Sequence, residues 1–485
     1  MTETNTTTTS NRWESFVTKA NMFVQKTHEH VIQGVNPGGV YQAIWCRDAS
    51  YILKDWFLSG NIDGAMQQIF LIWSHQISPN KEKLVYGRGS PKIKFTAQVA
   101  TAEKEKEFEG GLPTTIYQAG FSEVYGEQPG IDSTALMIST TSYILARCLK
   151  EEKQEDEGSF SENLSSLRPT IASEHSSDYV SALLSKLGIT DPSKVIHFVV
   201  PRMLRAIDYL ISRDIDNDGL LEQNHNEDWM DTALRAGKIV YSQACWLLAL
   251  NQLSILLSKL GKDMEADRLI QLADKTIHAA DQKLWSKQDG CYIDVQESDT
   301  IDEPYKLLTQ DVSLYLVAIT ENTANDNLRI QHHNNKKKKQ QQQQEPKTIH
   351  LDLHNKAIST LNALRKRVWK EKWQLITESE LKKTGPWILK PYQYHNHTFW
   401  PWTTGIEMLA RSRFNEIEEC DILLSKLISK DHPDLHIHTF YEWVNPITDQ
   451  GGGAYPFRTG ISAVRIAIAD IVEKIKESSS SSDSI

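Results

Sequence analysis

The sequence lacks the features of a secreted or membrane-spanning protein. No stretch of its 485 residues approaches the roughly 20 uninterrupted apolar residues that a membrane-spanning helix needs. Its first residues, MTETNTTTTSNRWES, contain neither the basic segment nor the apolar segment of a secretory signal. We therefore expect a cytoplasmic protein with no membrane partner.

The chain also has few cysteines and no net positive charge. The five cysteines are far apart and form no CxxC pair, which argues against a zinc site and a disulfide framework and predicts buried free thiols. They are Cys46, Cys148, Cys245, Cys291 and Cys420. The net charge of −10 disfavours nucleic acid as a partner, because phosphates require clustered cations. The basic run Lys336–Lys339 precedes a glutamine run, and we interpret it as part of a solvated loop.

Aromatic residues, in contrast, are plentiful. The chain has 13 Trp and 16 Tyr, whose flat apolar faces suit either a core or the stacking of sugar rings. Hydrophobic residues make up 40% of the chain, enough for a large core. A chain of this length predicts two or three domains or one large barrel.

Four polar segments are expected to lie outside that core. The N-terminus (1–11) and the tail (478–485) are predicted to be disordered, because they cannot bury apolar surface. Two further segments, near 151–178 and 331–347, are predicted to be loop insertions. The remainder, 12–477, is predicted to form a single catalytic domain.

Helical periodicity dominates this domain. In one stretch, apolar residues recur at steps of three or four and therefore share a helix face: Ile461, Val464, Ile468, Ile471 and Ile475. The same analysis predicts about twelve helices, which begin near residues 12, 48, 62, 132, 196, 240, 263, 310, 351, 402, 415 and 458. Only short stretches such as KLVYGRG and KIKFTA are typical of strands, and they could form a small hairpin. The sequence predicts an all-α protein.

The connections between these helices alternate in character. Those before every second helix are rich in aromatic and charged residues: IWCRD, GEQPGIDST, NEDWMD, KLLTQD, YHNHTFWPW and YEWVNPITDQGGGAYPF. The intervening ones, such as LSGN and KLGK, are short and plain. This alternation predicts an (α/α)6 barrel, in which six inner helices point their N-termini toward one cavity. The alternative, an irregular helical array, would not require the connections to alternate.

Two of the enriched loops offer the carboxyl pair that glycosidic-bond cleavage needs. Asp231 follows Trp229 and Met230, whose apolar side chains would raise the pKa of a carboxyl group and keep it protonated. Asp228 and Glu227 compete for the same role, and any of the three could instead cap a helix.

Glu442 is the second candidate. It lies between Tyr441 and Trp443, before an Asn-Pro turn and the glycine-rich segment 451–453. An acid held between aromatic residues in a loop predicts a functional carboxylate, although a surface residue is the alternative.

Five segments of the chain, WCRDASYIL, IDSTAL, EDWMD, YHNHTFWPW and YEWVNPITDQGGG, resemble in order motifs of the (α/α)6-barrel glycosidases. The relatives that they resemble are the glycogen-debranching amylo-α-1,6-glucosidases, the processing α-glucosidases and the glucoamylases. The resemblance extends from about Trp45 to Arg458. It implies that Asp231 is the general acid and Glu442 the general base.

The resemblance also implies residues that bind the sugar. Arg47 and Asp48 match a pair that clamps the hydroxyl groups of the non-reducing-end sugar, a task that suits a guanidinium and a carboxylate. The other residues implied in substrate binding are Trp45, Asp132, Asp228, Trp229, His395, Asn396, Trp400, Trp402, Tyr441 and Trp443. Debranching enzymes usually have Thr before Trp229 and Lys after Asp231, where this chain has Asp and Thr. This difference leaves the natural glycan open.

A separate pattern predicts a structural Ca²⁺. The segment DIDNDG begins like a calcium loop, with Asp214, Asp216 and Asp218 as ligands and Glu222 at the ninth position. Position twelve is His225 rather than Glu, so an Asp-rich turn without a metal is the alternative.

Together these patterns predict an exo-acting, inverting hydrolase of the α-glucosidase type that removes terminal glucosyl residues and needs no catalytic cofactor. Sugar phosphorylases on the same barrel are one alternative, although no basic or hydroxyl cluster adjoins the Glu442 loop. Sugar 2-epimerases, which use paired histidines, are another, with His395 and His397 as the candidates. A non-catalytic glycan-binding protein is the third.

Overall fold

A ring of helices forms the centre of the protein. The computed structural model describes residues 8–79, 83–89, 96–118, 120–151, 192–296, 306–322, 346–381, 389–428 and 440–482. The inner helices are α2 (Cys46–Leu58), α5 (Ile131–Glu151), α8 (Val240–Lys259), an unlabelled helix covering 312–322, α12 (Pro401–Arg413) and α14 (Arg458–Ser482). Along this ring α5 contacts both α2 and α8, and α14 contacts both α12 and α2. The ring is therefore closed by its first and last helices.

Hydrogen bonds join the unlabelled helix to its two neighbours. Asn251 of α8 donates to the carbonyl of Ala318 (3.1 Å). Gln310, just before the helix, donates to Glu407 of α12 (2.7 Å) and accepts from Thr403 (2.6 Å). All of these groups are buried, and their pairing removes the cost of leaving polar atoms unbonded between helices.

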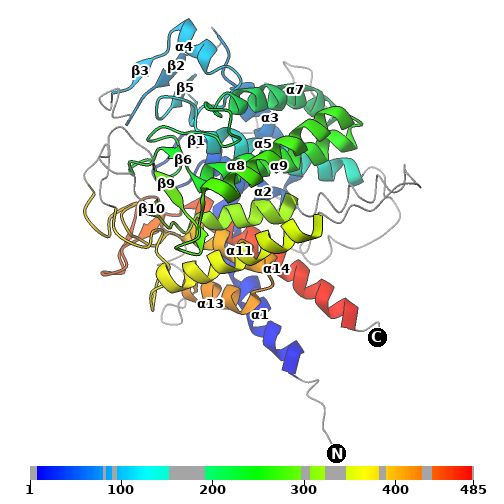
Figure 1. Ribbon diagram of the computed structural model, residues 1–485, viewed down its shortest axis with the longest axis vertical. Helices are drawn as coiled ribbons and strands as arrows, with labels where there is room; N and C mark the ends of the chain where they lie inside the picture. Colours follow the sequence, from blue (N-terminus) through cyan, green and yellow to red (C-terminus); the bar gives the residue numbers. More distant parts are fainter. Residues whose placement is uncertain are drawn as a thin grey trace, which may run out of the picture.

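An outer layer of helices surrounds the ring (Figure 1). It consists of α1 (Thr8–Val31), α3 (Ile62–Ser74), α7 (Pro192–Ile211), α9 (Asp263–Lys283), α11 (Pro346–Arg367) and α13 (Ile417–Leu427), each of which precedes an inner helix in the chain. The short helix α4 (Ala102–Glu107) was not predicted. This arrangement confirms the predicted all-α (α/α)6 barrel, and α3, α8, α9 and α14 begin at the predicted residues.

The burial of α8 and α9 shows why one helix is inner and the next outer. Every residue of α8 from Val240 to Ser254 is buried, as expected of a helix surrounded by others. Helix α9 buries one stripe, which includes Ala266, Leu269 and Ala273. By length and composition α8 could cross a membrane, but 94% of its most apolar window is buried inside the protein, as in a core helix.

A five-stranded sheet, which the sequence did not predict, projects at the end of the molecule opposite to the chain termini (Figure 1). Its strand order is β1 (Ile44–Trp45), β4 (Thr115–Tyr117), β5 (Phe121–Val124), β2 (Lys83–Tyr86) and β3 (Gln98–Val99). Of the predicted hairpin, KLVYGRG contains β2, whereas the partner strand begins one residue after KIKFTA, most of which lies outside the described residues. Because β1 runs directly into α2, the sheet adjoins the N-terminal ends of the inner helices.

Three small sheets shape other loops on the barrel. One contains β6 (Gly237–Lys238), β9 (Asp294–Gln296) and β10 (Lys306–Leu307); the others pair β7 (Trp285–Ser286) with β8 (Cys291–Tyr292), and β11 (Trp443–Val444) with β12 (Gly451–Gly452). The five cysteines form no disulfide, as predicted, and all except Cys148 are buried.

The predicted polar segments are described only in part. Helix α1 begins at Thr8 and α14 continues to Ser482, so the segments predicted to be disordered contain helical turns. Residues 1–7 and 483–485 lie outside the described residues, as do 152–191 and 323–345, which include most of the two predicted insertions.

Candidate active site

The N-terminal ends of the inner helices surround a cavity of about 280 Å³. Eight of the predicted site residues line it: Trp45, Arg47, Asp48, Trp229, Asp231, Trp400, Trp402 and Glu442. They come from the connections before α2, α8, α12 and α14 or from the first turns of these helices. The alternation of enriched loops therefore identified the correct side of the barrel.

Glu442 is held by three hydrogen-bond donors. Its Oε1 accepts from the hydroxyl groups of Tyr41 (2.9 Å) and Tyr394 (3.2 Å), and its Oε2 accepts from the backbone N–H of Ala454 (2.8 Å). Burial raises the pKa of this carboxyl to about 7, and the three hydrogen bonds act in the opposite direction. Donors favour the ionised form of a carboxyl, so this site is built for a carboxylate.

Glycines in the β11–β12 hairpin allow this arrangement. Gly453 has a φ of +74°, and a Cβ there would lie 2.2 Å from Glu442 Oε2, so no larger residue fits. The rings of Tyr441 and Trp443 lie over Gly451 and Gly452, where a Cβ would approach them to 2.2 and 2.4 Å. Tyr441 and Trp443 were predicted to bind substrate, but neither lines the cavity, and both pack against the hairpin.

Asp231 has the opposite environment. Its Oδ1 is buried, and no described residue donates a hydrogen bond to it. His395 Nδ1 lies 3.7 Å away, but burial and then Arg47 lower the pKa of His395 well below its usual value, so the ring is neutral. Burial is the main cause that raises the pKa of Asp231 to about 7, and Glu442 adds to it. A buried carboxyl without donors favours the protonated form.

A buried charge cluster holds the loop that carries Asp231. The guanidinium of Arg235 contacts Asp228 (3.1 Å), Asp294 (2.8 Å) and Asp311 (2.9 Å). Asp311 also accepts from Trp229 Nε1 (2.6 Å), and Asp228 accepts from the backbone N–H of Met230 (2.9 Å). Asp228, predicted to bind substrate, does not line the cavity; it fixes the turn that leads to Asp231.

Arg47 and Asp48 lie together on the cavity wall. Arg47 Nη2 contacts Asp48 Oδ2 (2.9 Å), and Asp48 Oδ1 accepts from the hydroxyl of Thr459 (2.7 Å). Asp132 lies outside the lining, with its Oδ2 3.6 Å from Arg47 Nη1. Burial raises the pKa of Asp132 to about 6, although Arg47 lowers it. Asp132 therefore supports Arg47 rather than facing the cavity.

Indole rings form another wall. The ring centre of Trp229 lies 4.6 Å from that of Trp402 and 5.3 Å from that of Trp400, and His395 stacks on Trp400 at 4.8 Å. Trp402 Nε1 is buried and has no acceptor among the described residues. Predicted as binding residues, His395 and Asn396 are buried but do not line the cavity. Asn396 accepts from the backbone N–H of residue 381 (2.8 Å).

Several solved structures that share this architecture are described as glycosidases. The sequence matches no protein-family model and no curated protein sequence. A GH63 mannosylglycerate hydrolase from Thermus thermophilus, in complex with glucose, has a TM-score of 0.51 at 15% identity, over 93% of this chain and 99% of that one. A protein described as a wild-type glycosidase has a TM-score of 0.51 at 10% identity, over 94% and 98%. This chain shares their fold. The fold predicted by the motif resemblance is thereby confirmed.

Other residues that line the cavity were not predicted. They are Pro37, Tyr41, Tyr125, Thr232, Leu389, Tyr394, Phe457 and Thr459. Tyr394 begins the quoted YHNHTFWPW segment and could have been selected with it. Tyr41 reaches Glu442 across 401 positions of sequence. Its neighbours Gly38 and Gly39 have φ values of +98° and +56°, so the glycine pair before it was a signal of a tight turn.

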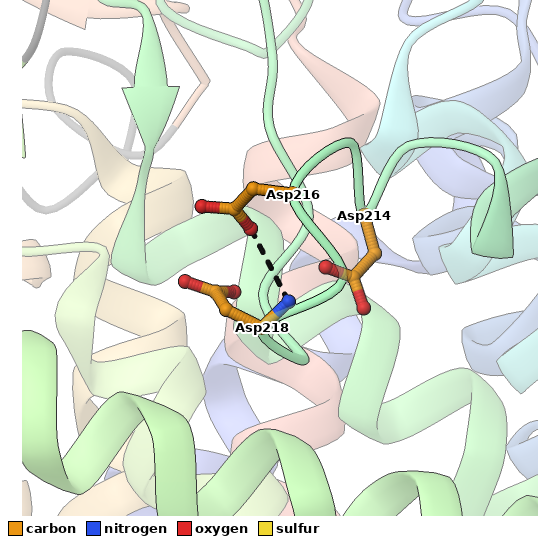
Figure 2. A group of neighbouring side chains, drawn as sticks. All are labelled: Asp214, Asp216 and Asp218. Carbon is orange, nitrogen blue, oxygen red and sulfur yellow. Dashed lines mark hydrogen bonds between the residues drawn. The ribbon is translucent and has the colours of Figure 1, made fainter.

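Lysine ammonium groups contact the carboxylates of the predicted calcium loop. The carboxylates of Asp214, Asp216 and Asp218 come within 4.8 Å of one another (Figure 2). The ammonium of Lys238, however, contacts Asp216 (2.6 Å), Asp218 (2.6 Å) and Glu222 (3.1 Å). Two more ammonium groups, from residues 275 and 283, contact Asp214 and Asp218.

Backbone N–H groups take up further carboxylate oxygens in this loop. Those of residues 215, 218 and 219 donate to Glu222, Asp216 and Asp214, and the Asp216 bond is drawn in Figure 2. With these partners the four predicted ligands fit a lysine-neutralised turn better than an open calcium cage.

Excess chelator is therefore expected to leave the melting temperature unchanged. A ligand that binds only the folded state stabilises it by mass action, so removing a bound Ca²⁺ would lower that temperature. Differential scanning calorimetry with chelator, and then with added Ca²⁺, is the measurement. A decrease that Ca²⁺ reverses would show that the metal displaces Lys238.

Proposed function

We propose that this protein is a glycoside hydrolase whose general acid is Asp231 and whose general base is Glu442. One observation carries the proposal: the carboxyl groups of Glu442, which is buried, and Asp231, whose side chain is 15% exposed, line the same cavity in opposite hydrogen-bond environments. Glu442 receives three donors, whereas Asp231 Oδ1 receives none from the described residues. An acid and a base with distinct environments are what glycosidic cleavage requires. The shared fold agrees with this function.

The finer proposal is an exo-acting, inverting hydrolase of the α-glucosidase type. Asp231 protonates the glycosidic oxygen as the bond to the anomeric carbon breaks, and Glu442 removes a proton from the water that attacks the opposite face of the sugar. Arg47 and Asp48 bind the hydroxyl groups of the terminal sugar. Asp231 ends ionised and Glu442 protonated, and proton exchange with solvent restores both.

Two alternatives receive less support from the cavity. Among the described lining residues Arg47 is the only cationic side chain, and Asp48 and Asp132 already pair with it, which disfavours the phosphate site of a phosphorylase. An epimerase would need histidines at the substrate, but His395 and His397 are absent from the described lining. Each instead shares a hydrogen bond with a threonine.

Proton NMR of the first product tests the mechanism. Maltose, isomaltose, trehalose, kojibiose and a glycogen limit dextrin are supplied in turn, and glucose release identifies the linkage. An inverting enzyme releases β-glucose from an α-linked substrate before mutarotation. Initial release of α-glucose would overturn the role of Glu442, and no hydrolysis of any glycoside would overturn the proposed function.

The rate is expected to have a bell-shaped dependence on pH. Glu442 must be ionised, so kcat/KM falls as the pH decreases through its pKa of about 7. Asp231 must be protonated, so kcat/KM falls as the pH increases through its pKa, also about 7. The maximum of kcat/KM should lie near neutral pH. Because the two carboxyl groups interact, the apparent pKa values of the acidic and alkaline limbs describe the pair and not either residue alone. A rate that is level from acidic to alkaline pH would contradict the assignment.

Asp48→Ala is expected to lower kcat/KM for every substrate roughly 10- to 150-fold. The reason is the loss of one charged hydrogen bond to the sugar, which corresponds to about 1.5–3 kcal/mol of transition-state stabilisation. Steady-state kinetics on the best substrate measures this, with the melting temperature as a control for folding. Activity within about threefold of wild type would show that Asp48 does not bind the sugar.

A further inference from the structure

The five-stranded sheet has two chemically different faces, which its register defines. Residues paired across neighbouring strands point to the same side of a sheet, and side chains alternate along each strand. Leu84 and Val124 lie on one face and pack with Ile77 and Phe108 in a small separate core. This face is buried at Leu84 and Val124, which pack against Phe108 at the end of α4, and it is exposed at Gln98.

The opposite face begins at the cavity. Trp45 pairs with Thr115, Thr115 with Glu123, and Tyr117 with Phe121, so all of these side chains share one side of the sheet. Tyr125 follows β5 two positions after Glu123 and lines the cavity together with Trp45, whose ring centre is 5.0 Å away. The cavity wall therefore continues onto the sheet.

This continuation begins beside the proposed acid. Tyr125 and Asp231 line the same cavity. A general acid lies on the leaving-group side of the scissile bond, because it protonates the departing oxygen. Because an exo-acting hydrolase holds the terminal sugar in its cavity, the part of the substrate that extends past Tyr125 is the leaving group.

Beyond Tyr125 the face carries groups suited to sugars. Tyr117 and Phe121 are half-buried and stack, with ring centres 4.3 Å apart and planes at 11°. Glu123 lies between them and the cavity, where it accepts from Arg88 Nε (2.5 Å) and from the Tyr117 hydroxyl (3.2 Å). The Arg88 side chain remains 50% exposed. A flat aromatic pair beside a fixed charged donor can stack on a ring and hydrogen-bond its hydroxyl groups.

The length of the strip indicates the size of the leaving group. From Phe121 to Tyr125 the backbone advances about 13 Å at the usual rise of a strand. This is longer than one sugar ring, so the strip fits a leaving group of more than one ring.

We propose that this face of the sheet binds the leaving-group side of the substrate, and that the substrate is an oligosaccharide or polysaccharide chain. The stacked pair Tyr117–Phe121 holds a distal sugar ring, and Arg88 donates to its hydroxyl groups. This inference rests on the proposed hydrolase function, since only in an exo-acting hydrolase is the leaving group the part of the substrate outside the cavity.

The test compares substrates with short and long leaving groups. The double variant Tyr117→Ala/Phe121→Ala is measured on α-glucosyl fluoride, whose leaving group is one atom, and on oligosaccharides of increasing length with the linkage that the wild type cleaves. We expect kcat/KM for the longer chains to fall about tenfold, as for truncation of a contact that contributes strongly to binding. The fluoride should be hydrolysed at the wild-type rate, which also shows that the variant is folded.

Two further variants serve as controls. Gln98→Ala removes a side chain from the opposite face of the same sheet and should change neither substrate class. Tyr117→Phe keeps the stacking surface and should retain most of the preference for long chains. Calorimetric titration of a non-cleaved oligosaccharide should show the same weakening in the double variant.

The outcomes separate the inference from the proposed function. Equal losses on fluoride and long chains, or no loss on either, would overturn the leaving-group site while leaving the hydrolase intact. A wild-type protein that cleaves neither the fluoride nor any oligosaccharide would overturn the proposed function, and the inference with it.

Discussion

Glu442→Gln is expected to lower kcat by about 10²- to 10⁴-fold for every substrate, including those with excellent leaving groups. Gln keeps the shape of the side chain but cannot accept a proton from the attacking water. Since Glu442 Oε1 accepts from Tyr41 and Tyr394, the amide oxygen can keep these two bonds, and substrate affinity should change little. Single-turnover kinetics on α-glucosyl fluoride and on an oligosaccharide measures the loss.

A carboxyl outside the cavity provides the matched control. Glu222 lies in the loop beside Lys238, and Glu222→Gln removes a charge without touching the cavity lining. Full activity in Glu222→Gln, together with the loss in Glu442→Gln, would attribute the effect to the base. Retention of more than about a tenth of wild-type activity in Glu442→Gln would contradict its role.

Asp231→Asn should separate substrates by their leaving groups. Oligosaccharides need a proton on the departing oxygen, so kcat for them is expected to fall by about 10²- to 10⁴-fold. Glycosyl fluorides need little protonation, and their rates should stay within about tenfold of wild type. The ratio of the two rates in one preparation is the measurement, and it is independent of the fraction of folded protein.

The same substitution should also remove the alkaline limb of the pH profile, because that limb reports the ionisation of Asp231. Equal losses on fluorides and oligosaccharides would indicate that the loop has moved, or that another group donates the proton.

The barrel could be predicted because its signal is local. Apolar spacing within each helix located α8 and α9 at the correct residues, and the character of the connections showed which helices are inner. The five-stranded sheet could not be predicted in the same way, because its strands are two to four residues long and their partners are distant. Val85, for example, pairs with Glu123 across a segment that contains two other strands.

The candidate site, like the fold, could be predicted from the sequence only where the signal is local. Asp231 and Glu442 were recognisable from their aromatic neighbours, since a carboxyl in an apolar loop is unusual. The role of Asp228 depends on Arg235, Asp294 and Asp311, which only the folded chain brings together. The sequence left the Asp-rich loop open between a calcium site and a turn without a metal, because Lys238 follows Asp218 by twenty positions, beyond the range of the motif.

Closure of the helical ring by α2 and α14 has a consequence for biosynthesis. Tyr41 and Glu442, which share a hydrogen bond, leave the ribosome 401 residues apart. Until α14 emerges, α2 has no partner on one side, and the helices form an open arc. Nascent chains expose such surfaces to aggregation and to chaperones. A ribosome-bound chain of this protein therefore cannot complete its cavity until its last inner helix has been made.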